Sequence, residues 1–246
     1  MLETLGSMST FALLGLGLVF GLKHATEVDH VVAVSTIVSK HRSVFRSALV
    51  GALWGAGHTA SLLVVGVIVL TMRVAIPETV SSWLEFCVAL MIIALGATAL
   101  WRALRANSHV HIHEHNHDGV PHVHVHFHEA ETKHSTYRPH SHALSSIGIK
   151  PVLIGTMHGL AGSGALTLLV LTQIKSAWVG FLYLAIFGIG SIAGMLLMSG
   201  LIGLPFVLTS RNLSGFHHRL QTAAACLSIA FGCWYAYQTG FASGLF

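Results

Sequence analysis

The chain has 246 residues, of which 53% are hydrophobic and only 9% are charged. Soluble domains usually carry about 25% charged residues, so this composition excludes an ordinary soluble globule. The formal charge of +4 gives no indication of nucleic acid as a partner, because most Lys and Arg residues lie in short loops between apolar segments and form no basic patch with interleaved aromatic residues.

Six apolar segments are long enough to cross a bilayer as helices and predict an all-α polytopic membrane protein. They cover residues 9–37, 47–72, 80–104, 147–173, 176–209 and 216–242. The N-terminus lacks the basic region of a secretory signal and carries Glu3, so we treat the first segment as a permanent span. The predicted units are a first transmembrane half at 1–105, a histidine-rich loop at 106–146 and a second transmembrane half at 147–246.

The loop charges predict the orientation of these spans. Ten Lys and Arg residues follow the first, third and fifth segments, whereas only Arg73 and Lys175 lie in the loops on the other side. The positive-inside rule then places the ten-charge side in the cytoplasm. We expect an integral protein of the plasma (inner) membrane, with both termini outside and the histidine-rich loop in the cytoplasm.

The two halves show a weak internal similarity. The aligned pieces are GLKH at 21–24 with GTMH at 155–158, WGAGH at 54–58 with FGIGS at 187–191, and the spacing from Glu85 to Gly96 with that from Gln221 to Gly232. Each half has an odd number of spans, so the second enters the membrane in the opposite orientation. The hypothesis is a 3+3 inverted repeat of six transmembrane helices with the substrate site where the halves meet. The alternative is chance similarity between Gly-rich apolar segments.

The first span contains five ionisable residues within eight positions: Lys23, His24, Glu27, Asp29 and His30. An ionisable group at this depth is costly unless it is paired, solvated or bound to metal. Imidazole and carboxylate ligands suit Ni²⁺, Co²⁺ and Zn²⁺. The three cysteines lie singly within apolar segments, so neither a disulfide nor a thiolate site is indicated.

Helix geometry leaves two alternatives for this cluster. On a straight helix His24, Glu27 and His30 share one face, whereas Asp29 lies roughly opposite. Either Asp29 orients an imidazole on a neighbouring helix, or the helix is unwound here and the side chains converge on one cavity. Lys23 is expected to pair with Glu27, which makes the histidines and Asp29 the stronger candidates for metal ligands.

Two further histidines lie near the middle of predicted spans. His58 in WGAGHTAS and His158 in GTMHGLAGSGAL are surrounded by small residues, which allow helices to approach closely. The alternative role of such a histidine is hydrogen-bonded packing. Because His158 aligns with His24 in the repeat, we predict that both His58 and His158 are metal ligands.

Three segments resemble motifs of the nickel/cobalt transporter family. HATEVDH at 24–30 is similar to the H-x₄-D-H signature of its first conserved helix, and GAGH at 55–58 resembles its second motif. GTMHGLAGSGAL at 155–166 is similar to the third segment of the short, UreH-like six-span branch. The resemblance covers most of the chain outside the histidine-rich loop.

The resemblance implies transport of Ni²⁺ or Co²⁺. It carries over four residues as members of the metal pathway: His24, Asp29, His30 and His58. This sequence departs from the usual H-A-x-D-A-D-H pattern, since Glu27 replaces an Asp and Val28 replaces a small residue. The classical uptake members of the family that this chain resembles are larger and lack a long histidine-rich loop. Efflux relatives often carry such a loop, so the resemblance leaves both directions of transport open.

The histidine-rich loop has a second kind of pattern. Residues 109–128 read HVHIHEHNHDGVPHVHVHFH, and strict alternation is the period of a strand. With residues 118–121 as a four-residue connection, we predict an antiparallel hairpin that pairs His117 with His122. One face then holds the histidines expected to capture metal: His109, His111, His113, His115, His117, His122, His124, His126 and His128. The alternative is a disordered tract that binds metal loosely, and metal binding would favour the ordered form.

These features predict a secondary transporter that moves Ni²⁺ or Co²⁺ inward through an intramembrane His/Asp site, whose ligands also suit Zn²⁺. Efflux of the same ions is one alternative, and a membrane-tethered metal donor or buffer for metalloenzyme maturation is another. Without an HExxH motif, a desaturase-type histidine box or a nucleotide-binding motif, we expect no enzymatic activity and no prosthetic group. The expected partners are membrane lipid, the transported ions and a cytoplasmic metallochaperone of urease or hydrogenase maturation.

Overall fold

The computed structural model describes residues 10–72, 76–106, 110–117, 120–127, 148–161, 174 and 176–246. Its elements in chain order are α2 (Thr10–His24), α3 (Val28–Val38), α4 (Val44–Met72), α5 (Glu78–Ala106), β1 (Val110–His117), β2 (Val120–Phe127), α7 (Lys150–Leu160), α9 (Ala177–Asn212), α10 (Ser214–Tyr237) and the π-helix η2 (Gln238–Ala242). Outside the hairpin of β1 and β2, every element in these ranges is helical, which confirms the all-α prediction for the apolar segments.

Three of these helices, α4, α5 and α9, are long and apolar enough to cross a membrane. The helices α2 and α3 make a fourth candidate span if the pair is counted as one helix bent by 52°. The chain is therefore a membrane protein. Helix α7 has 11 residues, and residues 162–173 of the predicted fourth span lie outside the described ranges, so the number of six spans stays a prediction.

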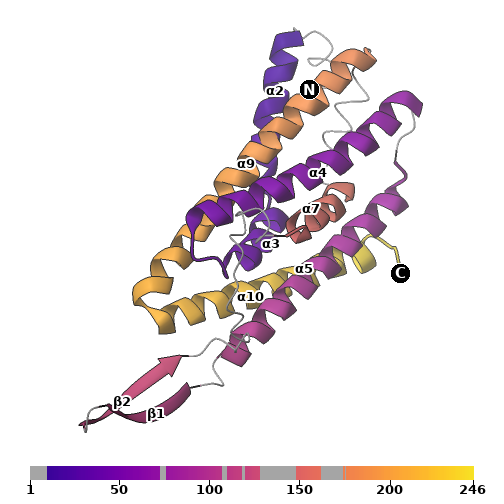
Figure 1. The fold of residues 1–246 in the computed structure, drawn as a ribbon. Coiled ribbons are helices and arrows are strands. Elements are labelled where there is room, and N and C mark those ends of the chain that lie inside the picture. Colours follow the sequence, from indigo (N-terminus) through magenta and orange to yellow (C-terminus); the bar gives the residue numbers. More distant parts are fainter. Residues whose placement is uncertain are drawn as a thin grey trace.

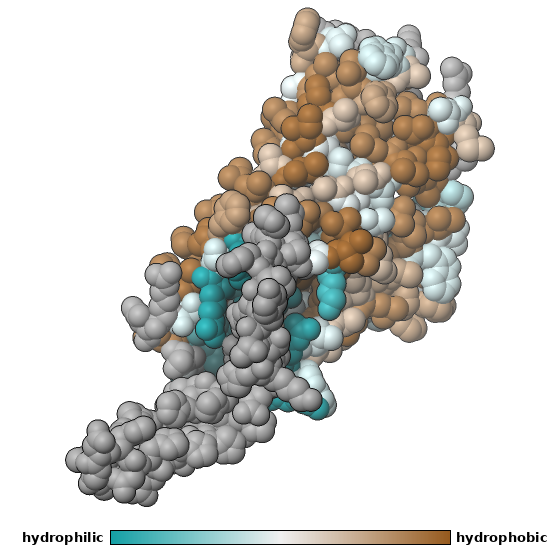
Figure 2. Space-filling model, in the orientation of Figure 1, coloured by the Kyte–Doolittle hydropathy of each residue, from teal (hydrophilic) through white to brown (hydrophobic). Residues whose placement is uncertain are grey.

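The outer surface of the helices matches a lipid environment. Figure 2 shows apolar side chains over much of one face, with hydrophilic residues gathered near the end from which the hairpin extends. On α9, for example, Leu197, Leu201 and Leu208 are 57%, 63% and 63% exposed. Large apolar side chains so widely exposed are unfavourable in water but are solvated by lipid chains.

The two halves of the sequence pack into one bundle. Helix α4 contacts both α9 and α7, α2 runs beside α9, and α5 pairs with α10, while the short α3 lies among α5, α9 and α10 (Figure 1). A buried cluster around Val38, Trp54 and Ile92 joins α3, α4 and α5. The central position of α3 brings its first turn into the interior of the bundle.

Glycines set the closest helix contacts. A Cβ atom at Gly21 of α2 would meet the carbonyl oxygen of Phe187 in α9, and one at Gly155 of α7 would meet the carbonyl oxygen of Trp54 in α4. Only a residue without a Cβ allows backbones to come this close, as in other membrane helix pairs. The polar groups of α2 and α7 are therefore held directly against α9 and α4.

The predicted hairpin is present, but its predicted register is wrong. Strands β1 and β2 are antiparallel, and His115 pairs with His122 rather than with His124. Only Asp118 and Gly119 separate the strands, so the connection has two residues and not four. Asp-Gly is a favoured two-residue hairpin sequence, and this shorter connection shifts the pairing by two positions. Because the shift is even, histidines of one strand still pair with histidines of the other in the backbone register.

Candidate metal centre

The candidate site begins at a break in the first apolar segment. Helix α2 ends at His24 and α3 starts at Val28. Between them, the amide of Thr26 donates to the carbonyl of Lys23 at 2.9 Å, and the hydroxyl of Thr26 donates to the same carbonyl at 2.6 Å. A Thr side chain that bonds to nearby backbone competes with the helical pattern, so the chain turns here. The structure thus selects the unwound alternative for this cluster.

One group of side chains at this break contains three histidines. His24 of α2, His30 of α3 and His58 of α4 each offer a ring nitrogen, and these atoms all lie within 4.8 Å of one another. All three rings are buried, and Nε2 of His24 lies 2.9 Å from Nε2 of His58. We call these three residues the histidine triad.

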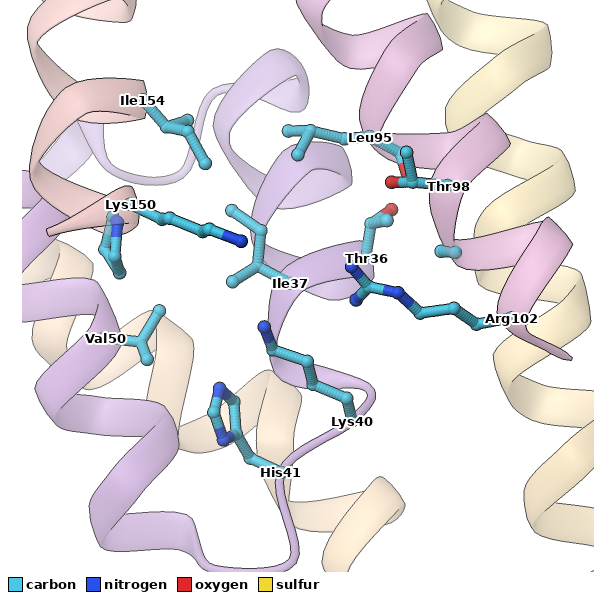
Figure 3. Close-up of a pocket in the computed structure, with 12 residues that line it drawn as sticks. Thr36, Ile37, Lys40, His41, Val50, Leu95, Thr98, Arg102, Lys150 and Ile154 are labelled. Carbon is cyan, nitrogen blue, oxygen red and sulfur yellow. The ribbon is translucent and has the colours of Figure 1, made fainter. Parts of the chain in front are cut away.

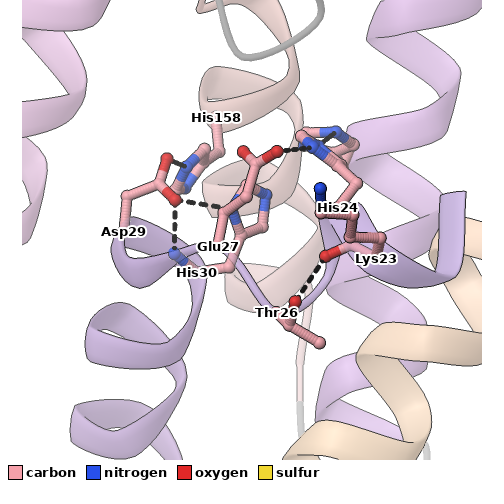
Figure 4. Close-up of polar contacts among 8 residues, drawn as sticks. Lys23, His24, Thr26, Glu27, Asp29, His30 and His158 are labelled. Atoms are coloured by element: carbon pink, nitrogen blue, oxygen red, sulfur yellow. Dashed lines mark hydrogen bonds and ion pairs between the residues drawn. The ribbon is translucent and has the colours of Figure 1, made fainter. Parts of the chain in front are cut away.

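A second group overlaps with the first. Asp29 accepts hydrogen bonds from Nδ1 of His30 and from Nε2 of His158, both at 2.9 Å (Figure 4). His158 comes from α7, so Asp29 connects the two halves of the chain. Asp29 was predicted either to orient an imidazole on a neighbouring helix or to lie on an unwound helix. Both are observed, because Asp29 follows the break and also contacts His158 of α7. Asp29, His30 and His158 also lie close enough to hold one ion.

Glu27 lies beside the histidine triad. Its Oε1 is 3.0 Å from Nδ1 of His24 (Figure 4), and its side chain is 41% exposed. The predicted pair of Lys23 and Glu27 is thus wrong, because the break moves the carboxylate toward His24. A carboxylate on one ring nitrogen fixes the tautomer and leaves the other nitrogen free to bind metal.

The two carboxylates orient two rings of the histidine triad, those of His24 and His30, in the same way. With Nδ1–H of His24 directed at Glu27 and Nδ1–H of His30 directed at Asp29, both rings present the lone pair of Nε2 to the interior. Nε2 of His30 is buried and has no hydrogen-bond partner among the described residues, and the same is true of Nδ1 of His58. Buried polar atoms are usually satisfied, so these nitrogens fit a bound cation. Imidazole ligands suit Ni²⁺, Co²⁺ and Zn²⁺.

Two aromatic residues that the sequence analysis did not select hold the site. Trp54 is fully buried, and its ring stacks on that of His30 with centroids 5.6 Å apart and planes 17° apart. Phe187 of α9 lies against His24, with centroids 5.6 Å apart. Trp54 precedes His58 by one helical turn, so the motif WGAGH already placed both on one face of α4. This spacing is the signal that identifies Trp54 in the sequence.

The structure brings together all six predicted residues of the intramembrane site: His24, Glu27, Asp29, His30, His58 and His158. The loop histidines lie elsewhere, because the hairpin extends away from the end of α5 (Figure 1). Of the nine predicted loop ligands, His109 and His128 lie outside the described residues. The backbone register pairs His111 with His126, His113 with His124 and His115 with His122.

Nearly the whole length of the chain matches one known protein. It is 36% identical over 235 residues to urease accessory protein UreH from Bacillus sp. (strain TB-90), which covers 96% of this chain and 95% of that protein. The chain belongs to the UreH family. No protein-family model matches this UreH-family chain, and no solved structure matches it.

Two plant proteins are more distant relatives of this UreH-family chain. Chloroplast proteins FOR GROWTH AND FERTILITY 1 and 2 of Arabidopsis thaliana are 24% identical over 210 residues and 25% identical over 205 residues. Each match covers 83% of this chain and about half of the plant protein, 53% and 50% respectively. Most of this chain is therefore similar to about half of each plant protein, and the plant proteins are longer.

Proposed function

We propose that the protein is a secondary transporter of Ni²⁺ or Co²⁺ and that uptake is its direction. The observation that carries this proposal is the histidine triad, which is buried inside apolar helices and backed by two carboxylates. A membrane anchor has no use for such residues, because each ionisable group at this depth costs free energy unless it has a partner. They are instead typical of ion pathways.

The family supports a nickel cargo. The relative from Bacillus is named as a urease accessory protein, and a supply of nickel to urease maturation fits that name. The resemblance of HATEVDH and GAGH to motifs of the nickel/cobalt transporter family points to the same ions. Supply of the metal to a cytoplasmic metallochaperone would complete this role.

The overlap of the two groups suggests how an ion moves through the site. His30 belongs both to the histidine triad and to the group with Asp29 and His158. An ion held by the triad can therefore pass to Asp29 and His158 while it keeps one ligand. Transfer without a stage of complete ligand loss lowers the barrier, because a bare divalent ion inside the bundle is strongly disfavoured.

A 3+3 inverted repeat is part of the proposal, and reciprocal glycine contacts support it. In the aligned halves Gly21 corresponds to Gly155, and Phe187 corresponds to Trp54. Gly21 lies against the carbonyl of Phe187, whereas Gly155 lies against the carbonyl of Trp54. Exchange of the halves thus converts one contact into the other, as expected for two units related by a pseudo-two-fold axis.

The third helices of the two halves show the same reciprocity. A Cβ at Gly96 of α5 would lie 3.0 Å from the carbonyl oxygen of Ala225, and one at Gly232 of α10 would lie 3.1 Å from that of Ala89. In the predicted alignment Gly96 corresponds to Gly232 and Ala89 to Ala225. The repeat proposal therefore accounts for contacts at both ends of each half, and it locates the candidate site between the halves.

Metal flux in proteoliposomes tests the function. With Ni²⁺ or Co²⁺ supplied outside, we expect saturable entry into vesicles that contain the protein and none into protein-free vesicles. In a second arm the vesicles are loaded with metal. Loss of metal from these vesicles, without entry in the first arm, would favour efflux instead. Absence of flux in both directions, with metal still bound by the protein, would favour a membrane-tethered donor and would refute transport.

The orientation is tested by labelling. The charge asymmetry of the loops predicts that the histidine-rich loop is cytoplasmic. A Cys introduced at Ser135, in a variant without the three native cysteines, should be shielded from a membrane-impermeant thiol reagent in intact cells. The same Cys should react after the cells are opened. Labelling in intact cells would invert the proposed topology.

The hairpin is proposed to capture metal and feed the pathway. The register places His113 opposite His124 and His115 opposite His122, so histidines of the two strands occur at paired positions, and binding of an ion by such pairs would favour the ordered hairpin. Deletion of 109–128 should therefore change the metal concentration for half-maximal flux and leave maximal flux measurable. Since protons compete with metal for the imidazole nitrogens, the loop should hold metal near pH 7.5 and release much of it near pH 5.5. Complete loss of flux in a correctly inserted deletion variant would contradict this role.

A further inference from the structure

A basic hollow lies at the end of the bundle from which the hairpin extends. Its volume is about 110 Å³, and it is bounded by the C-terminal end of α3, by α4 and α5, and by the first turn of α7 (Figure 3). Four basic side chains line it: Lys40, His41, Arg102 and Lys150. No acidic residue is among the lining residues. The floor is apolar and includes the buried residues Ile37 and Val50.

Among the described residues, no carboxylate neutralises the basic side chains of the hollow. Lys40 follows the end of α3, Arg102 lies on α5 and Lys150 starts α7. None of the three forms an ion pair with an acid in the part of the chain that the structure describes. Partial burial, together with the charges of Arg102 and Lys150, lowers the pKa of Lys40 from its ordinary value. Like charges gathered in this way repel one another, and an anion bound between them relieves the repulsion.

The first turn of α7 adds a second observation. This helix of 11 residues starts at Lys150, has no side-chain cap and has no acidic residue in its first turn. A basic residue at a helix N-terminus opposes the helix dipole, whereas an anion there is stabilised by the dipole and by free amide groups. The end of α7 and the three cations therefore favour the same kind of ligand at the same place.

The position of the hollow fits a phosphate group. The hollow lies at the end of the bundle from which the hairpin extends, and Figure 2 shows hydrophilic residues gathered at that end beside the apolar helices. Such a boundary corresponds to the depth of lipid headgroups. Arg102 presents a planar guanidinium that binds phosphate oxygens in pairs, and the lysines add point charges. A transported divalent cation, in contrast, would be repelled by this set.

We propose that this hollow is a binding site for a phosphate-class anion, supplied by the headgroup of an anionic lipid or by free phosphate. The bound anion links α3, α5 and α7. Since α3 carries Asp29 and His30 and α7 carries His158, occupancy of the hollow stabilises two of the elements that form the candidate metal centre. The proposal does not require that the metal centre transports an ion.

Thermal unfolding of the purified full chain in an uncharged detergent tests the proposal. One arm adds inorganic phosphate at an ionic strength kept constant with chloride, and the other adds phosphatidylglycerol, with phosphatidylcholine as its comparison. We expect a saturable rise of the melting temperature in at least one arm. Saturation with inorganic phosphate assigns a soluble anion, and saturation with phosphatidylglycerol alone assigns a lipid headgroup.

Variants locate the effect. Arg102→Gln and Lys150→Gln should each weaken the apparent affinity about tenfold, as expected for loss of one charge-assisted hydrogen bond. Arg105→Gln is the matched control, because Arg105 lies on the same helix but packs on the ring of Trp101, with 4.3 Å from its guanidinium carbon to the ring centroid. If Arg102→Gln does not fold, Arg102→Lys replaces it in the test. This variant keeps the positive charge and should retain most of the rise in melting temperature.

Two results would overturn the proposal. One is a melting temperature that responds to phosphate no more than to chloride and to phosphatidylglycerol no more than to phosphatidylcholine. The other is an equal loss of affinity in Arg105→Gln and Arg102→Gln, which would indicate a general effect of surface charge. Metal flux is not the readout, so failure of the transporter proposal would leave this test unaffected.

Discussion

Replacement of His30 by Ala is expected to reduce Ni²⁺ or Co²⁺ flux at least about a hundredfold while the protein still inserts in the membrane. His30 is the one histidine that belongs to both groups of candidate ligands, and its Nε2 is buried without a partner among the described residues. Loss of a residue that only supports a ligand typically costs 10–100-fold in metal affinity or activity, so loss of a shared ligand should reach at least the upper end.

Initial rates of metal entry into proteoliposomes measure this effect, with equal amounts of inserted protein in each sample. His217→Ala is a matched control, because His217 lies at the start of α10, where its Nδ1 is 3.1 Å from the hydroxyl of Thr209, away from both groups of ligands. The control should transport at the rate of the unchanged protein. Flux of His30→Ala within a few-fold of that rate would remove the histidine triad from the pathway.

The sequence was sufficient to identify the members of the candidate site but not their roles. The cost of His24, Asp29 and His30 inside an apolar segment follows from composition alone. The spatial arrangement of these residues does not follow from composition. It depends on a turn in which the hydroxyl of Thr26 donates to the carbonyl of Lys23. A side chain that bonds to local backbone is compatible with either a continuous or a broken helix, and packing in the bundle decides between them.

The hairpin shows a similar division. Alternation of histidines predicts two antiparallel strands in which histidine pairs with histidine. The strands are antiparallel, and the register pairs three histidines of β1 with histidines of β2. The connection was predicted too long because all four residues at 118–121 were assigned to the turn, whereas β2 already begins at Val120. In a two-stranded hairpin each strand is an edge, so the missing amide of Pro121, which pairs with Asn116, is tolerated there. The sequence Asp118-Gly119 was the better guide to the turn.

The basic hollow is beyond what sequence patterns predict. In the sequence, Lys40, Arg102 and Lys150 are separate loop-end charges whose evident role is to orient the spans. Their convergence arises only when α3, α5 and α7 meet at one end of the bundle. Contacts between distant segments of this kind require the fold itself, whereas spans and ligand-type residues are local properties of the chain.

Gly155→Val and Gly21→Val are each expected to destabilise the folded bundle by about 3 kcal/mol, the upper end of the usual cost of overpacking. Their side chains would meet main-chain carbonyl oxygens, of Trp54 and Phe187 respectively, and a backbone cannot move away as a flexible side chain can. Thermal unfolding of the purified protein, together with the yield of inserted protein in cells, measures the loss.

The comparison of these two variants also tests the architecture. Gly15→Val is the control, since nothing lies within 4 Å of a Cβ built at Gly15 on the same helix as Gly21. It should unfold at the temperature of the unchanged protein. If the halves form an inverted repeat, Gly21→Val and Gly155→Val remove equivalent contacts, so their costs should agree within about 1 kcal/mol. A large loss at one position and none at the other would show that the two close contacts are not equivalent, and the repeat would lose its main structural support.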